Sequence, residues 1–255
     1  MLLAVDVGNT QTHLGVFDGT RLVEHWRLAT EAEATADELA VMVASLLRLR
    51  QIELGAIDAS IVSTVVPRLG PEYWRMCERN LTNACLMVGP NLKTGMAIKI
   101  DNPHELGADR LVNAVAAYDK VGGACVAVDF GTSSNFDAVS AAGEYLGGVI
   151  APGVEISMEA LTERTAKLPR IDLGEPNSAI GKNTQAAIQA GVVYGFAGMI
   201  DGIARRLAGE LGDATTFIAT GGLAGAIVPF CETIDEVDDL LTLTGLRLVY
   251  ERNDQ

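Results

Sequence analysis

Short apolar runs separated by polar turns open the chain and predict a β-meander. The first run, residues 2–7, ends at an acid and a glycine turn, and apolar positions resume over residues 13–17 and 22–26. Runs of this length, bounded by turn residues, are typical of strands. We therefore expect three neighbouring strands at the start of the fold.

A helical period follows the meander. Thr35 and Glu38 have the spacing of a capping box, and apolar positions then recur at helical intervals over residues 39–47. This pattern predicts an amphipathic helix that buries one face. Residues 59–66 return to a strand, which ends at Pro67.

The middle of the chain predicts shorter elements. We expect a helix over residues 73–80, a short strand near residues 86–88 and a helix over residues 107–118. The last helix would carry Asp109 and Arg110 in its first turn, where the helix dipole stabilises an ionised carboxylate.

The second half repeats the order of the first. Strands are expected from Cys125 and over residues 136–140 and 145–150, followed by a long helical region over residues 186–211. A further apolar strand, residues 216–220, runs into another glycine turn.

The two halves of the chain also share a sequence motif that contains an aspartate. The stretches LLAVDVGNT and CVAVDFGTS place Asp6 and Asp129 at matching positions, each before a glycine and a small polar residue. A single copy is explained better by a hairpin whose aspartate and asparagine simply favour the turn. Two copies favour a phosphate and metal site, because a carboxylate that ends an apolar strand is costly to bury without a cation or partner. We predict two similar domains, residues 1–118 and 119–255.

Composition narrows the range of partners. The chain has 255 residues, of which 49% are hydrophobic and 20% charged, as in a globular protein, and its formal net charge is −14. That charge repels phosphate backbones and anionic lipids, so we expect neither nucleic acid nor a membrane as a partner. A bound ATP or small acid would need local amides, cations or basic side chains.

Signals for targeting and for zinc are weak. The start has no basic n-region, and apolar stretches such as residues 39–47 are shorter than the roughly 18 residues of a membrane helix, which indicates a soluble cytoplasmic protein. The four cysteines form no CxxC pair and the three histidines are scattered. Zinc sites and disulfide frameworks therefore have little support.

Two glycine motifs of the second half need separate interpretation. Residues 220–222 can be a tight strand-to-helix connection, but in a protein that grips a nucleotide between two domains they would lie against adenosine. The Gly181-Lys182-Asn183 segment is not a Walker loop, because Gly174 lies too far ahead and no Ser or Thr follows the lysine directly.

The order and identity of these motifs resemble those of type III pantothenate kinases. Asp-Gly turns are generic to the actin, hexokinase and Hsp70-like superfamily, whereas Gly-Ala-Asp-Arg and Gly-Lys-Asn-Thr are much more specific to this family. The resemblance implies an α/β fold of two similar ribonuclease H-like domains with an interdomain cleft. The matching segments span nearly the whole chain: residues 6–10, 102–103 with 107–110, 129–132, 147–148 with 151–153, 181–184, 220–222 and 241–246.

The resemblance also implies an activity, the ATP-dependent phosphorylation of pantothenate to 4'-phosphopantothenate, which is the first step of coenzyme A synthesis. ATP would be the co-substrate, and Mg²⁺ with a monovalent cation, K⁺ or NH₄⁺, would be the cofactors. Phosphoryl transfer needs mainly positioning and charge neutralisation. The family is dimeric, so we expect a homodimer.

The resemblance implies that ATP is bound by one continuous run of residues near the start of the chain and by a few residues of its second half. Asp6 would hold Mg²⁺ through water, and amides of the following loop would cradle phosphate. Asp129 would bind the monovalent cation. The nucleotide contacts implied are Asp6, Val7, Gly8, Asn9, Thr10, Gln11, Thr12, His13, Thr132, Gly221 and Gly222.

For pantothenate, the resemblance implies that Asp109 is the general base and that Arg110 holds the substrate carboxylate in a bidentate fork. The alternatives for these two residues are a helix-capping aspartate and a surface ion pair. The remaining substrate contacts implied are Ile100, Gly107, Ala108 and Thr184.

Two departures from the family pattern are visible. Ile100 stands where many members carry a substrate-contacting tyrosine, and residues 132–135 read Thr-Ser-Ser-Asn where a threonine-rich run is more usual. Two other functions stay open: a non-catalytic, ligand-sensing or regulatory relative, and a phosphotransferase for a sugar or acyl substrate. The presence of Asp6, Asp109 and Asp129 together argues against the first, and a substrate panel would separate the second.

Overall fold

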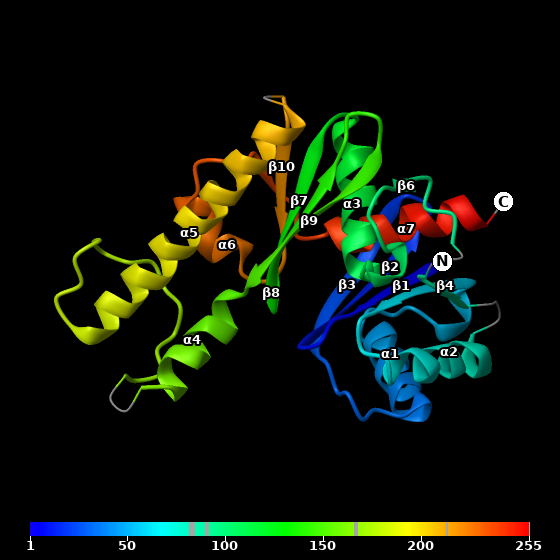
Figure 1. Ribbon diagram of the computed structural model, residues 1–255. Coiled ribbons are helices and arrows are strands. Elements are labelled where there is room, and N and C mark those ends of the chain that lie inside the picture. The colour runs from blue at the N-terminus through cyan, green and yellow to red at the C-terminus, as the bar shows by residue number, and fades with distance from the viewer. Residues whose placement is uncertain (82–84, 90–91, 166–167, 213, 255) are drawn as a thin grey trace. The chain divides into compact units, whose positions relative to one another are not determined.

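The computed structural model describes residues 1–81, 85–89, 92–165, 168–212 and 214–254 (Figure 1). The chain divides into two compact units. Unit 1 contains residues 1–96, 101–116 and 241–255, and unit 2 contains residues 97–100 and 117–240.

Unit 1 is built on a five-stranded sheet of order β3-β2-β1-β4-β5. The predicted meander is confirmed, because β1 pairs antiparallel with β2 and β2 pairs antiparallel with β3. The other two strands continue the sheet in parallel with β1. The bounds are β1 Leu2–Val7, β2 Gln11–Asp18, β3 Arg21–Ala29, β4 Ala59–Thr64 and β5 Cys85–Met87.

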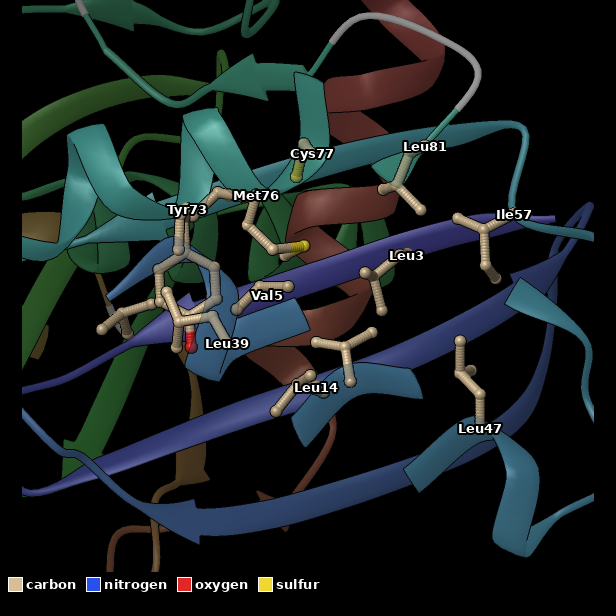
Figure 2. Close-up of a cluster of buried hydrophobic side chains, with 14 of the residues drawn as sticks. Leu3, Val5, Leu14, Leu39, Leu47, Ile57, Tyr73, Met76, Cys77 and Leu81 are labelled. Carbon is tan, nitrogen blue, oxygen red and sulfur yellow. The ribbon is translucent and has the colours of Figure 1, made fainter. Parts of the chain in front are cut away.

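One face of this sheet buries the first core. Successive residues of a strand point to opposite faces, so alternate positions of β1 and β2 meet the helices α1 and α2. The capping box predicted before α1 is confirmed, since Thr35 accepts from the Glu38 N–H and the Glu38 side chain accepts from the Thr35 N–H. Figure 2 shows the resulting cluster, which includes Leu3, Val5, Leu14, Leu39, Leu47, Ile57, Tyr73, Met76, Cys77 and Leu81. The helices are α1 Ala36–Leu49 and α2 Leu69–Asn80, with the 3-10 turn Leu54–Ala56 between them.

The chain's last helix also belongs to unit 1. Helix α7, Leu241–Asn253, contacts β1, β2 and β4, and Gly15 of β2 lies so near Leu243 that an added Cβ would be 3.0 Å from its side chain. Against α3, Ala108–Val121, the approach is closer still: a Cβ on Gly245 would lie 2.1 Å from the Val112 carbonyl oxygen. Glycine is therefore required at position 245 for this packing.

Unit 2 repeats the topology of unit 1. Its sheet has the order β11-β10-β7-β8-β9-β6, so β9, β8, β7, β10 and β11 correspond to β3, β2, β1, β4 and β5. The repeat predicted from the sequence is thereby confirmed at the level of strand order. The bounds are β6 Ala97–Ile98, β7 Cys125–Phe130, β8 Ser133–Val139, β9 Glu144–Pro152, β10 Thr216–Thr220 and β11 Glu236–Val237.

Helix α5, Thr184–Leu211, is the main helix of the second core. Its residues Val193, Ala197, Ile200 and Ala204 are buried with side chains of β7, β8 and β10. By length and composition this helix could cross a membrane, which corrects the expectation that apolar stretches are too short, but the core helix of a soluble protein passes the same test. The other helical segments are α4 Val154–Glu163, α6 Ala224–Ile227 and the 3-10 turn Val228–Phe230.

The predicted domain limits, residues 1–118 and 119–255, stay a prediction. The two compact units differ from a division at a single boundary in two segments. Residues 241–255 lie with unit 1, where α7 packs on its sheet, and residues 97–100 lie with unit 2, where β6 pairs with β9.

Candidate active site

The first candidate region is the loop after β1 in unit 1. The N–H of Gly8 donates to the Gln11 carbonyl at 3.0 Å, and a Cβ at Gly8 would lie 2.9 Å from that same oxygen. The end of β3 supports the loop, because the Thr30 hydroxyl donates to the Gly8 carbonyl at 2.8 Å and the Thr30 N–H donates to the Thr10 carbonyl at 2.9 Å. Asn9 and Thr10 are exposed at its tip. The loop is therefore a fixed turn with accessible backbone.

The strand register divides the predicted ATP-binding run between two faces. Asp6 lies directly opposite His13, and both point away from the α1 and α2 core. Val7 and Thr12 form the next pair and point into that core. Side chains of Asp6 and His13 therefore lie on the face that α7 partly covers, near the end of β1 where a ligand can approach, whereas Val7 can contribute only its backbone.

Two features of the Asp6 surroundings fit a hydrated cation. On the other side of Asp6, β4 places Ser63 opposite it, and the buried Ser63 hydroxyl has no hydrogen-bond partner within the described part of the chain. Carboxylate and hydroxyl oxygens are the donors that Mg²⁺ and its waters prefer. His13 is neutral at pH 7, because burial first and then the charges of Arg27 and His25 lower its pKa to about 4.

The second candidate region is the start of α3. Asp109 is half-buried in the first turn and accepts a 2.8 Å hydrogen bond from the Arg110 N–H. A Cβ at Gly107 would lie 2.6 Å from Asp109 Oδ1, so glycine leaves room for the carboxylate. Burial raises the pKa of Asp109, and the N–H and guanidinium of Arg110 partly offset that rise. A raised pKa makes the ionised carboxylate a better proton acceptor.

In unit 2 the structure brings two of the predicted motifs together. Asp129 of β7 pairs with Thr220 of β10, and the glycine after it approaches so closely that a Cβ on Gly221 would lie 2.5 Å from Asp129 Oδ1. Gly221 also has φ +96°, a conformation that favours glycine. On its other side Asp129 pairs with Asn135. The surroundings of Asp129 therefore offer neutral oxygen donors, which suit a hard cation.

The turn that carries Thr132 is closed by the end of β9. The Gly131 N–H donates to the Ser133 carbonyl at 3.1 Å, and a Cβ on Gly153 would lie 2.2 Å from the Thr132 carbonyl oxygen. Gly153 caps α4, an element that the sequence did not predict. It therefore fixes this turn by close backbone packing.

Thr184 begins α5 beside a groove of about 800 Å³. The helix start is well defined, because Asn183 accepts from the Ala186 N–H at 2.8 Å and Gly181 packs directly against Ala187. Ile100 lies elsewhere in unit 2, where a Cβ on Gly147 would be 3.5 Å from its side chain. The predicted substrate residues thus fall in both units, with Gly107, Ala108, Asp109 and Arg110 in unit 1.

Metal-binding clusters give no alternative centre. Over the ranges that the structure describes, there is no group of three or more His, Cys, Asp or Glu side chains placed to hold a metal ion. Sequence reasoning missed Ser63 and Arg27, which lie in the same cross-strand row as Asp6. No local motif marks these two residues, and the sheet register alone reveals them.

Comparison with known proteins identifies the family. The family model for type III pantothenate kinases matches residues 2–206. The chain belongs to the type III pantothenate kinase family. It is 52% identical to the type III pantothenate kinase of Streptomyces avermitilis, over 99% of this chain and 98% of that one, and 50% identical to that of Myxococcus xanthus, over 99% of each.

A solved structure supports the fold class. The ROK hexokinase of Thermus thermophilus superposes with a TM-score of 0.54 at 15% identity, covering 100% of this chain and 99% of that one. The predicted family and the predicted α/β fold of the actin and hexokinase class are confirmed. This chain is therefore a kinase, and ATP is its co-substrate.

Proposed function

We propose that this type III pantothenate kinase transfers the γ-phosphoryl group of ATP to the primary hydroxyl of pantothenate, which gives 4'-phosphopantothenate for coenzyme A synthesis. The observation that carries the mechanism is the half-buried carboxyl of Asp109 in the first turn of α3, with its raised pKa. Full-length similarity to named members of the family supports the choice of substrate.

Asp109 is the proposed general base. Its carboxylate accepts the proton of the pantothenate hydroxyl as the oxygen forms a bond to the γ-phosphorus and the bond to the departing ADP breaks. Arg110, next in the chain, binds the pantothenate carboxylate through its guanidinium fork. Gly107 and Ala108 supply backbone groups beside them.

In unit 1, the nucleotide's phosphates are assigned to the loop after β1. Asp6 would hold Mg²⁺ through water with help from the Ser63 hydroxyl. The Gly8 N–H is used within the turn, so the amides of the exposed residues Asn9 and Thr10 are assigned to phosphate oxygens. Bound Mg²⁺ would supply charge neutralisation at the phosphates. Gln11 and His13 lie on the same face of β2 as a second contact set.

In unit 2, Asp129 is assigned to a monovalent cation, K⁺ or NH₄⁺. The neutral oxygen donors around it and the close approach of Gly221 support this assignment. Thr132, Gly221 and Gly222 are assigned to ATP. Thr184, with its hydroxyl beside the α5 groove, and Ile100 are assigned to pantothenate.

We also expect a homodimer that acts in the cytoplasm, with neither nucleic acid nor membrane as a partner. The groove along α5 supports the dimer because its lining is largely apolar: Leu161, Leu168, Ile188, Val192, Phe196 and Met199 all face it. Apolar lining of this kind is favourable to cover with a second protein surface. Ultracentrifugation of the purified chain would test the oligomeric state.

The deciding experiment measures ATP-dependent phosphate transfer to pantothenate with Mg²⁺, in parallel potassium and sodium buffers. We expect transfer in potassium only, and its loss in Asp109→Asn. Absence of transfer in both buffers, from folded protein that still binds pantothenate, would instead favour a ligand-sensing relative. Transfer to a sugar or acyl acceptor in place of pantothenate would identify a different phosphotransferase.

A further inference from the structure

A row of four side chains crosses the sheet of unit 1 at the level of Asp6. The strand register places Ser63 of β4, Asp6 of β1, His13 of β2 and Arg27 of β3 in neighbouring positions. Directly paired residues point to the same face, and this face is opposite the α1 and α2 core. The row therefore ends in a positive charge on the face that carries Asp6.

The guanidinium of Arg27 has no bonded partner among the residues that the structure describes. Arg27 is exposed, and across the described ranges it makes neither an ion pair nor a side-chain hydrogen bond. By contrast, Arg21, Arg50 and Arg68 of the same unit each pair with a carboxylate. In a chain of net charge −14, where carboxylates are abundant, an arginine without one can bind an anionic ligand when its position brings it beside that ligand.

Three observations place this charge beside the nucleotide loop. Arg27 lies opposite His13, and its charge is one of the causes that keep the His13 imidazole neutral. Three residues further along, Thr30 bonds to the carbonyls of Gly8 and Thr10, so this end of β3 is attached to the loop. The short distance along the strand lets a long side chain reach along the loop's face.

The strand topology does not by itself require a positively charged side chain at the position of Arg27. In unit 2 the matching row runs from Thr220 through Asp129 and Asn135 to Ile150, whose side chain is 64% exposed. The same strand position thus accepts an exposed isoleucine. A role in solubility or strand pairing alone does not explain why the equivalent residue of unit 1 is an arginine.

We propose that Arg27 binds the phosphate chain of ATP, as a fixed cation that acts together with the loop amides of residues 9 and 10. The proposal rests on the assignment of that loop to the nucleotide. Asp6 repels an approaching polyphosphate, and a guanidinium in the same row offsets that repulsion while donating two parallel hydrogen bonds to phosphate oxygens. Arg27 is therefore a nucleotide-binding residue outside the run from Asp6 to His13.

The test compares Arg27→Gln and Arg27→Lys with Arg48→Gln in the full-length protein. Arg48 is a matched control because it is exposed in the last turn of α1, on the core side of the sheet, and its loss changes the net charge equally. Binding of ATP with Mg²⁺ is measured by titration calorimetry, and the KM values for ATP and for pantothenate are measured separately.

We expect Arg27→Gln to weaken ATP binding by about 10- to 100-fold, the usual range for a lost charge-assisted contact. In Arg27→Gln, KM for ATP should rise by a similar factor, while KM for pantothenate stays within about twofold of wild type. Arg27→Lys should recover part of the lost ATP affinity, and Arg48→Gln should behave as wild type. A merely structural role would instead lower the thermal stability and affect both substrates. Unchanged ATP binding in Arg27→Gln would overturn the proposal.

The outcome for Arg27 is separable from that for the proposed function. A wild-type protein that binds ATP through Arg27 but transfers nothing to pantothenate would leave the present proposal intact and refute the activity. If the protein phosphorylates pantothenate but Arg27→Gln binds ATP as well as wild type does, the activity is supported and the role of Arg27 is refuted.

Discussion

Replacing Asp109 with asparagine removes one proton acceptor and changes little else. The two side chains have nearly the same shape, and the asparagine oxygen can still accept the 2.8 Å hydrogen bond from the Arg110 N–H. The space that Gly107 leaves for the carboxylate is equally sufficient for the amide. Any large effect on turnover therefore reports on the charge and basicity of this group.

The expected effect on activity is large. A positioned general base contributes about 10²- to 10⁴-fold to the rate, so kcat of Asp109→Asn should fall by that factor. The corresponding loss of transition-state stabilisation is about 2.7–5.5 kcal/mol. Binding of ATP should stay close to wild type, because Asp109 is not assigned to the nucleotide.

The expected effect on stability has the opposite sign. Burial raises the pKa of Asp109 in the folded protein, so the ionised carboxylate destabilises the fold at pH values above that pKa. The neutral variant should therefore be at least as stable as wild type at pH 8. The difference should shrink as pH falls below the pKa of the folded state and disappear below the lower pKa of the unfolded chain, where the carboxyl is neutral in both states.

Single-turnover kinetics and urea unfolding of the same preparations measure the two effects together. Asp119→Asn is the matched control, because Asp119 is exposed on the same helix and its loss changes the net charge equally. Normal turnover in Asp109→Asn would refute the assignment of the base. An equal fall in Asp119→Asn would attribute the effect to the general field of the helix.

Three further predictions concern packing, the cation and thiol reactivity. Gly245→Ala would place a Cβ 2.1 Å from the Val112 carbonyl oxygen, so urea titrations should show its unfolding free energy lowered by about 3 kcal/mol. The control Gly209→Ala has open space for a Cβ and should raise the unfolding free energy by about 0.5–1 kcal/mol. Asp129→Ala should make turnover the same in potassium and sodium, and retained potassium dependence would move that site elsewhere. Burial raises the pKa of Cys125 to about 12, so mass spectrometry should find this thiol unalkylated by iodoacetamide at pH 8 until the protein unfolds.

Local sequence signals predicted much of the fold. The capping box at Thr35 and the apolar periods identified α1, α3 and α5, because these depend on neighbours within a few residues. Helix α4 was missed since its cap is Gly153, which gives no polar cap signal. Strand β6 was missed because its two residues form a strand only through pairing with β9. The place of α7 depends on the contact of Gly245 with Val112, which no local pattern shows.

The residues of the candidate site likewise divide into those that local sequence motifs predict and those that only the structure shows. Asp6, Asp109 and Asp129 lie in motifs that are readable along the chain, and the structure then adds their surroundings. Arg27 and Ser63 lie far from Asp6 in sequence and join it only through the sheet register. The roles proposed for these two residues depend on contacts across strands, with no motif of their own, and are therefore the part of the proposed site that required a structure.

The two repeats share a topology and differ in charge at equivalent positions. In unit 1 the row through Asp6 ends in Arg27, and in unit 2 the row through Asp129 ends in Ile150. A carboxylate with a neighbouring cation suits a hydrated metal beside an anionic phosphate, because the arginine offsets the repulsion between carboxylate and phosphate. In unit 2 the residues of the row itself, beside Asp129, are neutral, which suits the proposed monovalent cation because the row adds no fixed positive charge. On the proposed assignments, one duplicated strand pattern serves an anionic phosphate in one copy and a cation in the other, and the residues that end the two rows, Arg27 and Ile150, differ in charge accordingly.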